Sequence, residues 1–259
     1  MKEVVIKMIN PFLTYRGGKH FLLKDIQFIY DQVPVKKNIL ADVFGGSGQV
    51  LMNLDANIKI YNDIDDLVYN VFFVIINNKN ALIDKLQNTI ISRKLFNIYK
   101  NNIKTNDPIE TAFRYIYVNT LSYAGRMDYP TFYYISHRKF LKLPELIDEY
   151  YKIIRGWIIE NDDFRNIIPR YDSNDTIFYL DPPYLGWSWY NHNFTESDMQ
   201  DLKGLLDNIS GKYIMNVIYS EEHVNIFGEP QLKKTYISNL DRSRTKRTEA
   251  FYVNYDFTL

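Results

Sequence analysis

Four consecutive residues, Asp181-Pro182-Pro183-Tyr184, follow directly on an apolar run at residues 177–180. The apolar run predicts a buried strand, and open α/β sheets bind their ligands beyond the carboxyl ends of such strands. The two prolines lack a backbone N–H and restrict the chain, so a carbonyl and the Asp181 carboxylate are held as acceptors beside an aromatic ring. This set suits a flat heterocycle whose exocyclic amino group donates to the acceptors while its ring stacks on Tyr184. A plain turn that ends the strand is the alternative.

A second candidate site is the glycine-rich turn at residues 42–48, which follows an apolar run at residues 39–43. Glycines allow a ligand to approach the main chain closely, and Asp42 beside them is suited to hold an ammonium group. The turn lacks the lysine of a P-loop and the spacing of a G-x-G-x-x-G motif, which disfavours phosphate binding. Asp63 closes the next predicted strand and is placed to accept hydrogen bonds from a ribose diol. An exposed acid in an ordinary strand–helix turn is the alternative.

Apolar periodicity predicts that these motifs lie in an α/β core interrupted by a long helical segment at residues 65–155. The core elements expected are strands at residues 39–43, 58–61, 177–180, 212–217 and 251–257, and helices at residues 49–53 and 196–208. Thr195 is the expected N-cap of the second helix, with Asp198 completing a capping box. A tight glycine turn followed by a cation, residues 15–19, precedes the core.

The composition is that of an ordinary globular protein: 259 residues, 46% hydrophobic and 24% charged. The absence of cysteine excludes disulfides, a thiolate nucleophile and cysteine-based metal sites. The four histidines are far apart in sequence, so we expect no metal cofactor. No apolar run is long enough to span a membrane, and no secretory signal opens the sequence. We therefore expect a cytoplasmic protein, monomeric in solution, with no membrane partner.

The formal net charge is zero, but the charge is unevenly distributed along the chain. Residues 88–142 hold nine basic residues against three acidic ones, and residues 231–248 hold six against one. Local excesses of this kind suit contact with phosphates, so overall neutrality does not exclude a nucleic acid partner. A solvated basic surface without a partner is the alternative.

Together these motifs resemble the DNA adenine-N6 methyltransferases of the Dam family over nearly the whole chain. The family's Y/W-x-G-G-K element matches residues 15–19, its D-x-F-x-G-x-G loop matches residues 42–48, and its D-P-P-Y segment matches residues 181–184. The order of glycine loop, insertion and D-P-P-Y is the family's alpha arrangement. Softer matches are the acidic–aromatic element at residues 161–164 and the closing basic loop and strand at residues 247–255.

The resemblance implies a Rossmann-like α/β fold. An S-adenosylmethionine-dependent methyltransferase core at residues 1–63 and 161–259 would hold a helical target-recognition insertion at residues 64–160. The implied reaction moves a methyl group from S-adenosylmethionine to N6 of an adenine flipped out of double-stranded DNA, with S-adenosylhomocysteine as product. The implied setting is a bacterial cell or a phage-infected host, as an epigenetic or restriction–modification enzyme.

The resemblance, together with the local excesses of basic residues, also assigns roles to residues. The expected catalytic residues are Asp181, Pro182, Pro183 and Tyr184. The expected cofactor-binding residues are Tyr15, Gly18, Lys19, Asp42, Phe44, Gly45, Gly46, Gly48, Asp63, Asp163 and Asp181. The residues expected to contact DNA are Arg93, Lys94, Asn119, Tyr123, Arg126, Asp128, Arg138, Lys139, Arg242, Arg244, Lys246 and Arg247.

Residues 117–128 resemble the family segment that inserts an aromatic residue into DNA and reads a guanine. Members that recognise GATC carry an asparagine after the aromatic residue and an arginine five residues beyond it. Here Ala124 follows Tyr123, Asp128 stands at the fifth position, and Arg126 is displaced. An acid in that place favours the amino group of a cytosine. GATC is therefore not carried over, and the target sequence stays open.

Two other functions fit part of the sequence. An RNA-base methyltransferase shares a glycine loop and a D-P-P-Y-like segment, but the simplest of these lack the insertion and the turn at residues 15–19. A catalytically inactive DNA-binding relative is disfavoured because residues 42–48, Asp63 and residues 181–184 are intact. A dehydrogenase is disfavoured by the missing G-x-G-x-x-G motif.

Overall fold

The structure, a computed structural model, describes residues 8–15, 18–184, 194–238 and 245–258. The chain packs as two compact units. We call one the helical unit, which comprises Met1–Leu23, Gly46–Asp55 and Asp65–Asn161. The other, the sheet unit, comprises Lys24–Gly45, Ala56–Ile64 and Asp162–Leu259. This division describes packing alone, and the separation into a catalytic and a recognition domain stays a prediction.

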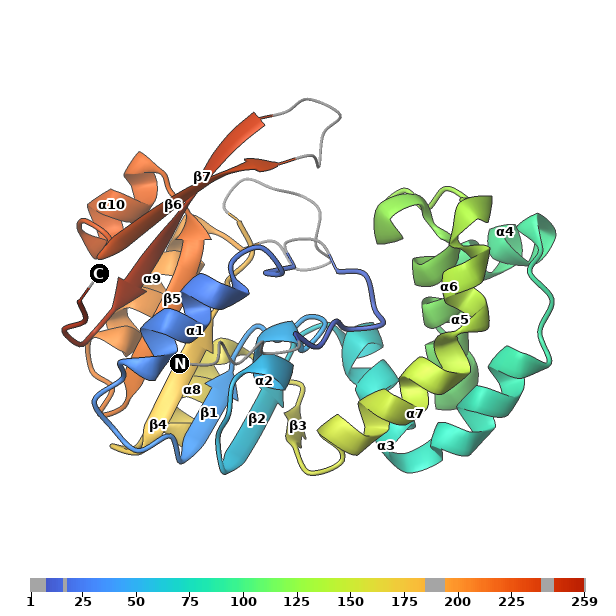
Figure 1. Ribbon diagram of the computed structural model, residues 1–259, viewed down its shortest axis with the longest axis horizontal. Coiled ribbons are helices and arrows are strands. Elements are labelled where there is room, and N and C mark those ends of the chain that lie inside the picture. The colour runs from blue at the N-terminus through green and yellow to red at the C-terminus, as the bar shows by residue number, and fades with distance from the viewer. Residues whose placement is uncertain (1–7, 16–17, 185–193, 239–244, 259) are drawn as a thin grey trace, which may run out of the picture. The chain divides into compact units, whose positions relative to one another are not determined.

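The sheet has seven strands in the order β3-β2-β1-β4-β5-β7-β6 (Figure 1). Their bounds are Ile39–Asp42 for β1, Ile58–Asn62 for β2, Ile158–Glu160 for β3, Thr176–Leu180 for β4, Lys212–Ile218 for β5, Leu232–Ser238 for β6 and Thr245–Val253 for β7. β2, β1, β4 and β5 run parallel, whereas β7 is antiparallel to both β5 and β6. The parallel strands point their carboxyl ends to one edge, where a ligand site is expected.

The helices of the sheet unit are α1 (Leu23–Asp31), α8 (Phe164–Tyr171), α9 (Glu196–Leu206) and α10 (Glu221–Phe227). Ile167 and Ile168 of α8 and Leu202 of α9 are fully buried in a cluster with one face of the sheet. The predicted capping box of α9 is confirmed, because Thr195 and Asp198 bond each other's backbone N–H. Burial of this apolar face is the main source of stability for such short helices.

The helical unit contains α2 (Gln49–Asn53), α3 (Asp66–Gln87), α4 (Arg93–Asn101), α5 (Pro108–Leu121), α6 (His137–Leu141) and α7 (Leu143–Ile154). α3 packs against α5 and α7. Asp65, Ser92 and Asp107 cap α3, α4 and α5 by accepting backbone N–H bonds. The predicted helical character of residues 65–155 is confirmed.

The prediction for the last strand is wrong in position. It placed the strand at residues 251–257, whereas β7 spans Thr245–Val253. The extra length comes from pairing with β6, which the sequence pattern did not predict because Leu232–Ser238 mixes lysines with apolar residues. Helix α9 is slightly shorter than predicted, since it ends at Leu206 rather than at residue 208.

Candidate active site

Three neighbouring parallel strands of the sheet unit each end in an aspartate. Asp63 follows β2, Asp42 is the last residue of β1, and Asp181 follows β4. The register places Asp42 opposite Tyr61 on one side and opposite Tyr179 on the other, so Asp63 and Asp181 each lie two residues beyond the position that pairs with Asp42. The parallel topology therefore places the three acids at the same edge of the sheet.

The carboxyl group of Asp42 is the most perturbed of the three. Asp42 is 2% exposed, and its Oδ1 has no hydrogen-bond partner among the residues described. Burial raises the pKa of Asp42 well above its usual value, and negative charge on Asp181 and Asp63 raises it further. A hydrogen bond from the backbone N–H of Phe44 acts in the opposite direction. A site with this charge balance suits a ligand that brings positive charge or hydrogen-bond donors.

The glycine loop after β1 is held against the end of β2. The N–H of Gly45 donates to the Asn62 carbonyl at 2.7 Å, and a Cβ on Gly45 would lie 2.3 Å from the Tyr61 ring. Any larger side chain at this position would clash, which explains the glycine. The buried Asn62 side chain donates to the Val43 carbonyl at 2.9 Å and to the Asp162 carbonyl at 3.0 Å. Asn62 thus fixes the loop, a role that the sequence pattern did not predict.

Phe44 and Asp163 have structural contacts in the sheet unit. The Phe44 ring lies 5.8 Å from the rings of Phe164 and Phe194, centroid to centroid. Asp163 caps α8 by accepting the Arg165 N–H at 2.8 Å, and it also forms an ion pair with the Arg165 guanidinium. These contacts place both residues beside the start of α8.

Tyr184, the last residue of the Asp-Pro-Pro-Tyr segment, is 8% exposed. Its hydroxyl donates to Oε1 of Glu249 on β7 at 3.4 Å. Pro182 is buried, while Asp181 and Pro183 are partly exposed. The segment therefore combines an acid, a rigid backbone and an oriented aromatic ring at the end of β4.

The other half of the glycine loop lies in the helical unit. Gly46 and Gly48 have φ values of +50° and +72°, a region that favours glycine. A Cβ on Gly46 would lie 2.9 Å from the Tyr15 ring. The Ser47 carbonyl accepts a 2.6 Å hydrogen bond from the hydroxyl of Tyr150 on α7. Of the predicted N-terminal turn, Lys19 is buried at 4% exposure and Gly18 is exposed.

Two residues predicted to contact DNA hold Thr14 in the helical unit. Asn119 is buried, and its amide accepts from the Thr14 N–H at 3.0 Å and donates to the Thr14 carbonyl at 2.8 Å. The Lys139 Nζ donates to the Thr14 Oγ1 at 2.7 Å. Burial lowers the pKa of Lys139. Both side chains therefore support the N-terminal segment. The sequence did not predict these contacts, because more than a hundred residues separate the partners.

The segment after α5 presents aromatic and charged side chains. Tyr123 is half-exposed, and its ring meets the Tyr133 ring edge to face at 5.2 Å. Arg126 and Asp128 form an ion pair of 3.4 Å between Nη2 and Oδ2. The Nε of Arg126 is buried and has no hydrogen-bond partner among the residues described. Arg138 of α6 is exposed.

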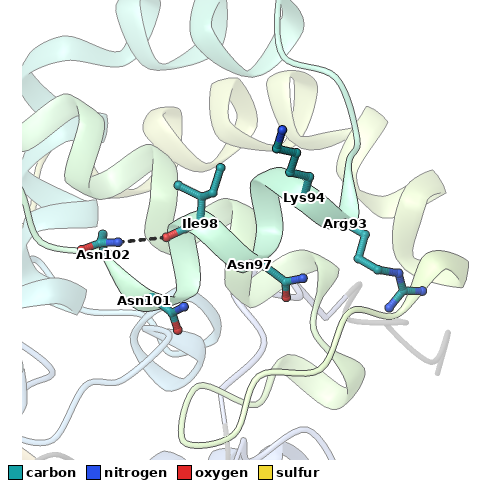
Figure 2. A pocket seen from close by; sticks show the side chains of 6 residues that line it. All are labelled: Arg93, Lys94, Asn97, Ile98, Asn101 and Asn102. Carbon is teal, nitrogen blue, oxygen red and sulfur yellow. Dashed lines mark hydrogen bonds between the residues drawn. The ribbon is translucent and has the colours of Figure 1, made fainter.

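The face of α4 is a candidate nucleic-acid surface. A shallow hollow of about 580 Å³ lies along this helix. Figure 2 shows the basic and amide side chains that line it. Its lining residues are Arg93, Lys94, Asn97, Ile98, Asn101 and Asn102. The guanidinium of Arg93 lies 4.8 Å from the centre of the Phe132 ring, which holds it in place.

Several other basic residues of the two segments are paired within the protein. Arg114 binds Glu110 at 2.7 Å, and Lys104 binds Asp66 at 3.3 Å. In the sheet unit, Lys234 binds Asp25 at 3.0 Å. Lys246 is exposed and Arg247 partly exposed, while Arg242 and Arg244 lie outside the described residues. Fewer basic side chains are therefore available to contact a partner than the number of lysines and arginines in these two segments suggests.

Two further properties concern the described part of the chain. No helix there is both long and apolar enough to cross a membrane. Across residues 8–15, 18–184, 194–238 and 245–258, no three His, Asp or Glu side chains are grouped closely enough to hold a metal ion.

Parallel β2, β1, β4 and β5, extended by the antiparallel pair β7 and β6, give a mixed α/β sheet in the arrangement of Rossmann-like methyltransferases. An acid closes three of the parallel strands, with a glycine loop after β1 and Asp-Pro-Pro-Tyr after β4. The chain belongs to the D12 class of N6 adenine-specific DNA methyltransferases, since the model of that family matches residues 15–248. The family resemblance predicted from the motifs is confirmed.

Individual relatives are distant in sequence. The Type II methyltransferase M1.LlaDCHI of Lactococcus lactis subsp. cremoris is 23% identical over 95% of this chain and 96% of its own length. The Type II methyltransferase M.CviBI of Paramecium bursaria Chlorella virus NC1A is 23% identical over 68% of this chain and 69% of its own. A DNA adenine methylase of Haemophilus influenzae is 25% identical over 68% of this chain and 64% of its own.

Proposed function

We propose that this protein transfers the methyl group of S-adenosylmethionine to N6 of an adenine that is flipped out of double-stranded DNA. The single observation that best supports this proposal is the row of acids at three neighbouring strand ends, with Asp181 opening the Asp-Pro-Pro-Tyr segment. Membership in the D12 family makes DNA adenine the expected substrate.

The residues of the sheet unit fit this cofactor. S-adenosylmethionine carries a sulfonium and an ammonium group, and both favour a site with excess negative charge. Asp42 offers a buried carboxyl oxygen without a partner among the described residues, next to the negative charge of Asp63 and Asp181. Asp63 would accept from the ribose hydroxyls. Tyr15, Gly18, Lys19, Gly46 and Gly48 stay predicted cofactor residues on motif grounds.

The Asp-Pro-Pro-Tyr segment would prepare the target nitrogen. The lone pair of adenine N6 is delocalised into the ring, so the amino group is a weak nucleophile. The Asp181 carboxylate and the Pro182 carbonyl would accept hydrogen bonds from the two N–H groups of the adenine amino group. These bonds would favour a more tetrahedral nitrogen. When bound, the cofactor supplies an electrophilic methyl group on sulfur. The protein then contributes orientation and electrostatic stabilisation, and no general base is required before transfer. As the N–CH3 bond forms, the S–CH3 bond would break, and the methylated N6 would then lose its extra proton to water.

Tyr184 would hold the extruded base by stacking on it, which repays part of the cost of unstacking the duplex. The side chain is buried and its hydroxyl is engaged, so the ring is already oriented before a base arrives. Preorganisation of this kind lowers the entropy cost of binding.

For DNA contact we propose the α4 surface and the segment that follows α5. Arg93 and Lys94 are exposed on α4 and would meet phosphates. Tyr123, Arg126 and Asp128 would act nearer the target bases, while Asn119 and Lys139 would act through Thr14. An inactive DNA-binding relative is not favoured, since the acids and the Asp-Pro-Pro-Tyr segment are complete.

The test is a methylation assay with radiolabelled S-adenosylmethionine and, in parallel, duplex DNA and RNA of random sequence. We expect label in DNA only, recovered as N6-methyladenine after digestion and mass spectrometry. Label in RNA alone would favour an RNA-base methyltransferase. Absence of both methyl transfer and cofactor binding by calorimetry would contradict the proposal.

A further inference from the structure

We infer that Glu249 is a positioning residue for Tyr184 and holds its ring in the orientation that the target base meets. The inference rests on the proposed function, because it concerns how a base-stacking ring is presented. Glu249 lies in β7, 65 residues after Tyr184 in the sequence, and the fold brings the two side chains together.

Glu249 is buried, which is unusual for a glutamate. It is 1% exposed, and its Oε1 accepts two phenol hydrogen bonds, from Tyr184 at 3.4 Å and from Tyr236 on β6 at 3.1 Å. The Oε1 of Glu249 thus links Tyr184, at the end of β4, to Tyr236 on β6, which lies beyond β5 and β7 in the sheet.

The anchor is rigid. Glu249 pairs with Ile218 of β5 and with Lys234 of β6, so its backbone is held in the sheet on both sides. The bond from Tyr236 fixes the Glu249 side chain as well. At the other end of Tyr184, Pro182 and Pro183 restrict the backbone. The Tyr184 side chain is therefore fixed at its base and at its hydroxyl.

The arrangement carries a cost for stability. The Oε2 of Glu249 is buried and has no hydrogen-bond partner among the residues described. Burying a polar atom without a partner is unfavourable, and an apolar side chain would pack here without that penalty. A carboxyl group at this position is better explained by its action on Tyr184 than by stability.

The first experiment compares Glu249→Leu with the conservative Glu249→Gln, whose amide oxygen still accepts both phenol bonds. We expect Glu249→Leu to slow single-turnover methyl transfer at saturating DNA and cofactor by about tenfold or more. Glu249→Gln should restore the rate to within about threefold, and the Kd for S-adenosylmethionine should change by no more than about threefold in either variant.

A spectroscopic readout reports the ring directly. With 2-aminopurine in place of the mapped target adenine, the fluorescence intensity depends on how the extruded base is stacked. We expect Glu249→Leu to change that signal and Glu249→Gln to keep it. A Glu249→Leu protein with the wild-type rate and the wild-type fluorescence would overturn the inference.

A double-variant comparison tests whether Glu249 acts through Tyr184. Tyr184→Phe keeps the ring and removes the hydroxyl. If the inference is right, adding Glu249→Leu to Tyr184→Phe slows the reaction little further, because the bond is already lost. Rate losses that multiply would contradict it. If Glu249→Leu does not fold, Tyr184→Phe alone decides, since a wild-type rate and wild-type fluorescence there would also overturn the inference.

The outcome is separable from that of the proposed function. A wild-type protein that neither binds S-adenosylmethionine nor methylates DNA refutes the proposed function. A wild-type protein that is active, with Glu249→Leu equally active, refutes only the role of Glu249.

Discussion

Asp42 and Asp181 end two neighbouring parallel strands, β1 and β4, and the negative charge of Asp181 is one cause of the raised pKa of Asp42. The two carboxylates at neighbouring strand ends repel each other while no ligand is present. Since burial is the largest cause of the shift, the charged form of Asp42 destabilises the free protein. The proposed role of Asp42 in cofactor binding would therefore oppose stability at this position.

Asp42→Asn should stabilise the free protein and weaken cofactor binding. The folded-state pKa of Asp42 lies above its unfolded value, so the stability penalty is absent below about pH 4 and grows as pH rises through the folded pKa. At pH 7.5 we expect Asp42→Asn to have a higher melting temperature than the wild type, by about 2–4 °C for each kcal/mol added to the free energy of unfolding. At pH 4 we expect no difference. Differential scanning calorimetry at both pH values measures this.

The control for Asp42→Asn is Asp256→Asn, which removes an exposed carboxylate from the same unit. It should leave the melting temperature and the cofactor affinity unchanged. Calorimetric titration with S-adenosylmethionine should give a Kd at least about tenfold weaker for Asp42→Asn. An Asp42→Asn protein with wild-type affinity would show that Asp42 does not serve the cofactor.

Asp181→Ala should abolish most methyl transfer without unfolding the protein. Asp181 is partly exposed, so its loss leaves no cavity in the core, but it removes the proposed acceptor for the target amino group. Loss of one such group typically costs about 10²–10³ in rate. Single-turnover methylation measures the effect, and Asp175→Asn is the matched control, since it changes an acid at the opposite end of the same strand. A near wild-type rate in Asp181→Ala would refute the catalytic assignment.

The acids at residues 42, 63 and 181 were predictable because each closes an apolar run, and parallel strands bring their carboxyl ends to one edge. The capping box of Thr195 was also predictable, because its partner Asp198 is only three residues away in the sequence. The bond from Tyr184 to Glu249 was not, because it depends on β7 lying between β5 and β6. Likewise, the bonds of Asn119 and Lys139 to Thr14 were not predictable, because more than a hundred residues of sequence separate the partners. Local patterns predicted the ends of the buried parallel strands β1, β2 and β4 to within a residue, whereas the position of β7 and the long-range partners come only from the fold.

Arg93→Gln and Lys94→Gln should each weaken DNA binding without altering the target sequence. Both side chains are exposed on α4, and contacts with phosphates carry no base information. Each lost contact should reduce the slope of log K against log salt by about 0.9. Fluorescence anisotropy at several salt concentrations measures the slope. Lys203→Gln is the control, because Lys203 is already paired with Asp207 on α9, and an equal loss there would argue for a general charge effect.

Asp128→Asn should change which base is preferred at one position of the target. Asp128 is paired with Arg126 through Oδ2, and a carboxylate in this segment suits the amino group of a cytosine. An amide both donates and accepts, so it discriminates less well. We expect the preference at that position to relax by about 10-fold or more, given that one good base contact contributes about 1–3 kcal/mol.

The measurement for Asp128→Asn is methylation of a random-sequence plasmid followed by mapping of N6-methyladenine. Glu149→Gln provides the control, since it removes an exposed acid from α7 of the same unit. It should leave the map unchanged. A wild-type map with no cytosine at any preferred position, or an identical map for Asp128→Asn, would contradict a base-reading role for Asp128. If methylation fell equally at every site, the Arg126–Asp128 ion pair would instead stabilise the conformation of the segment.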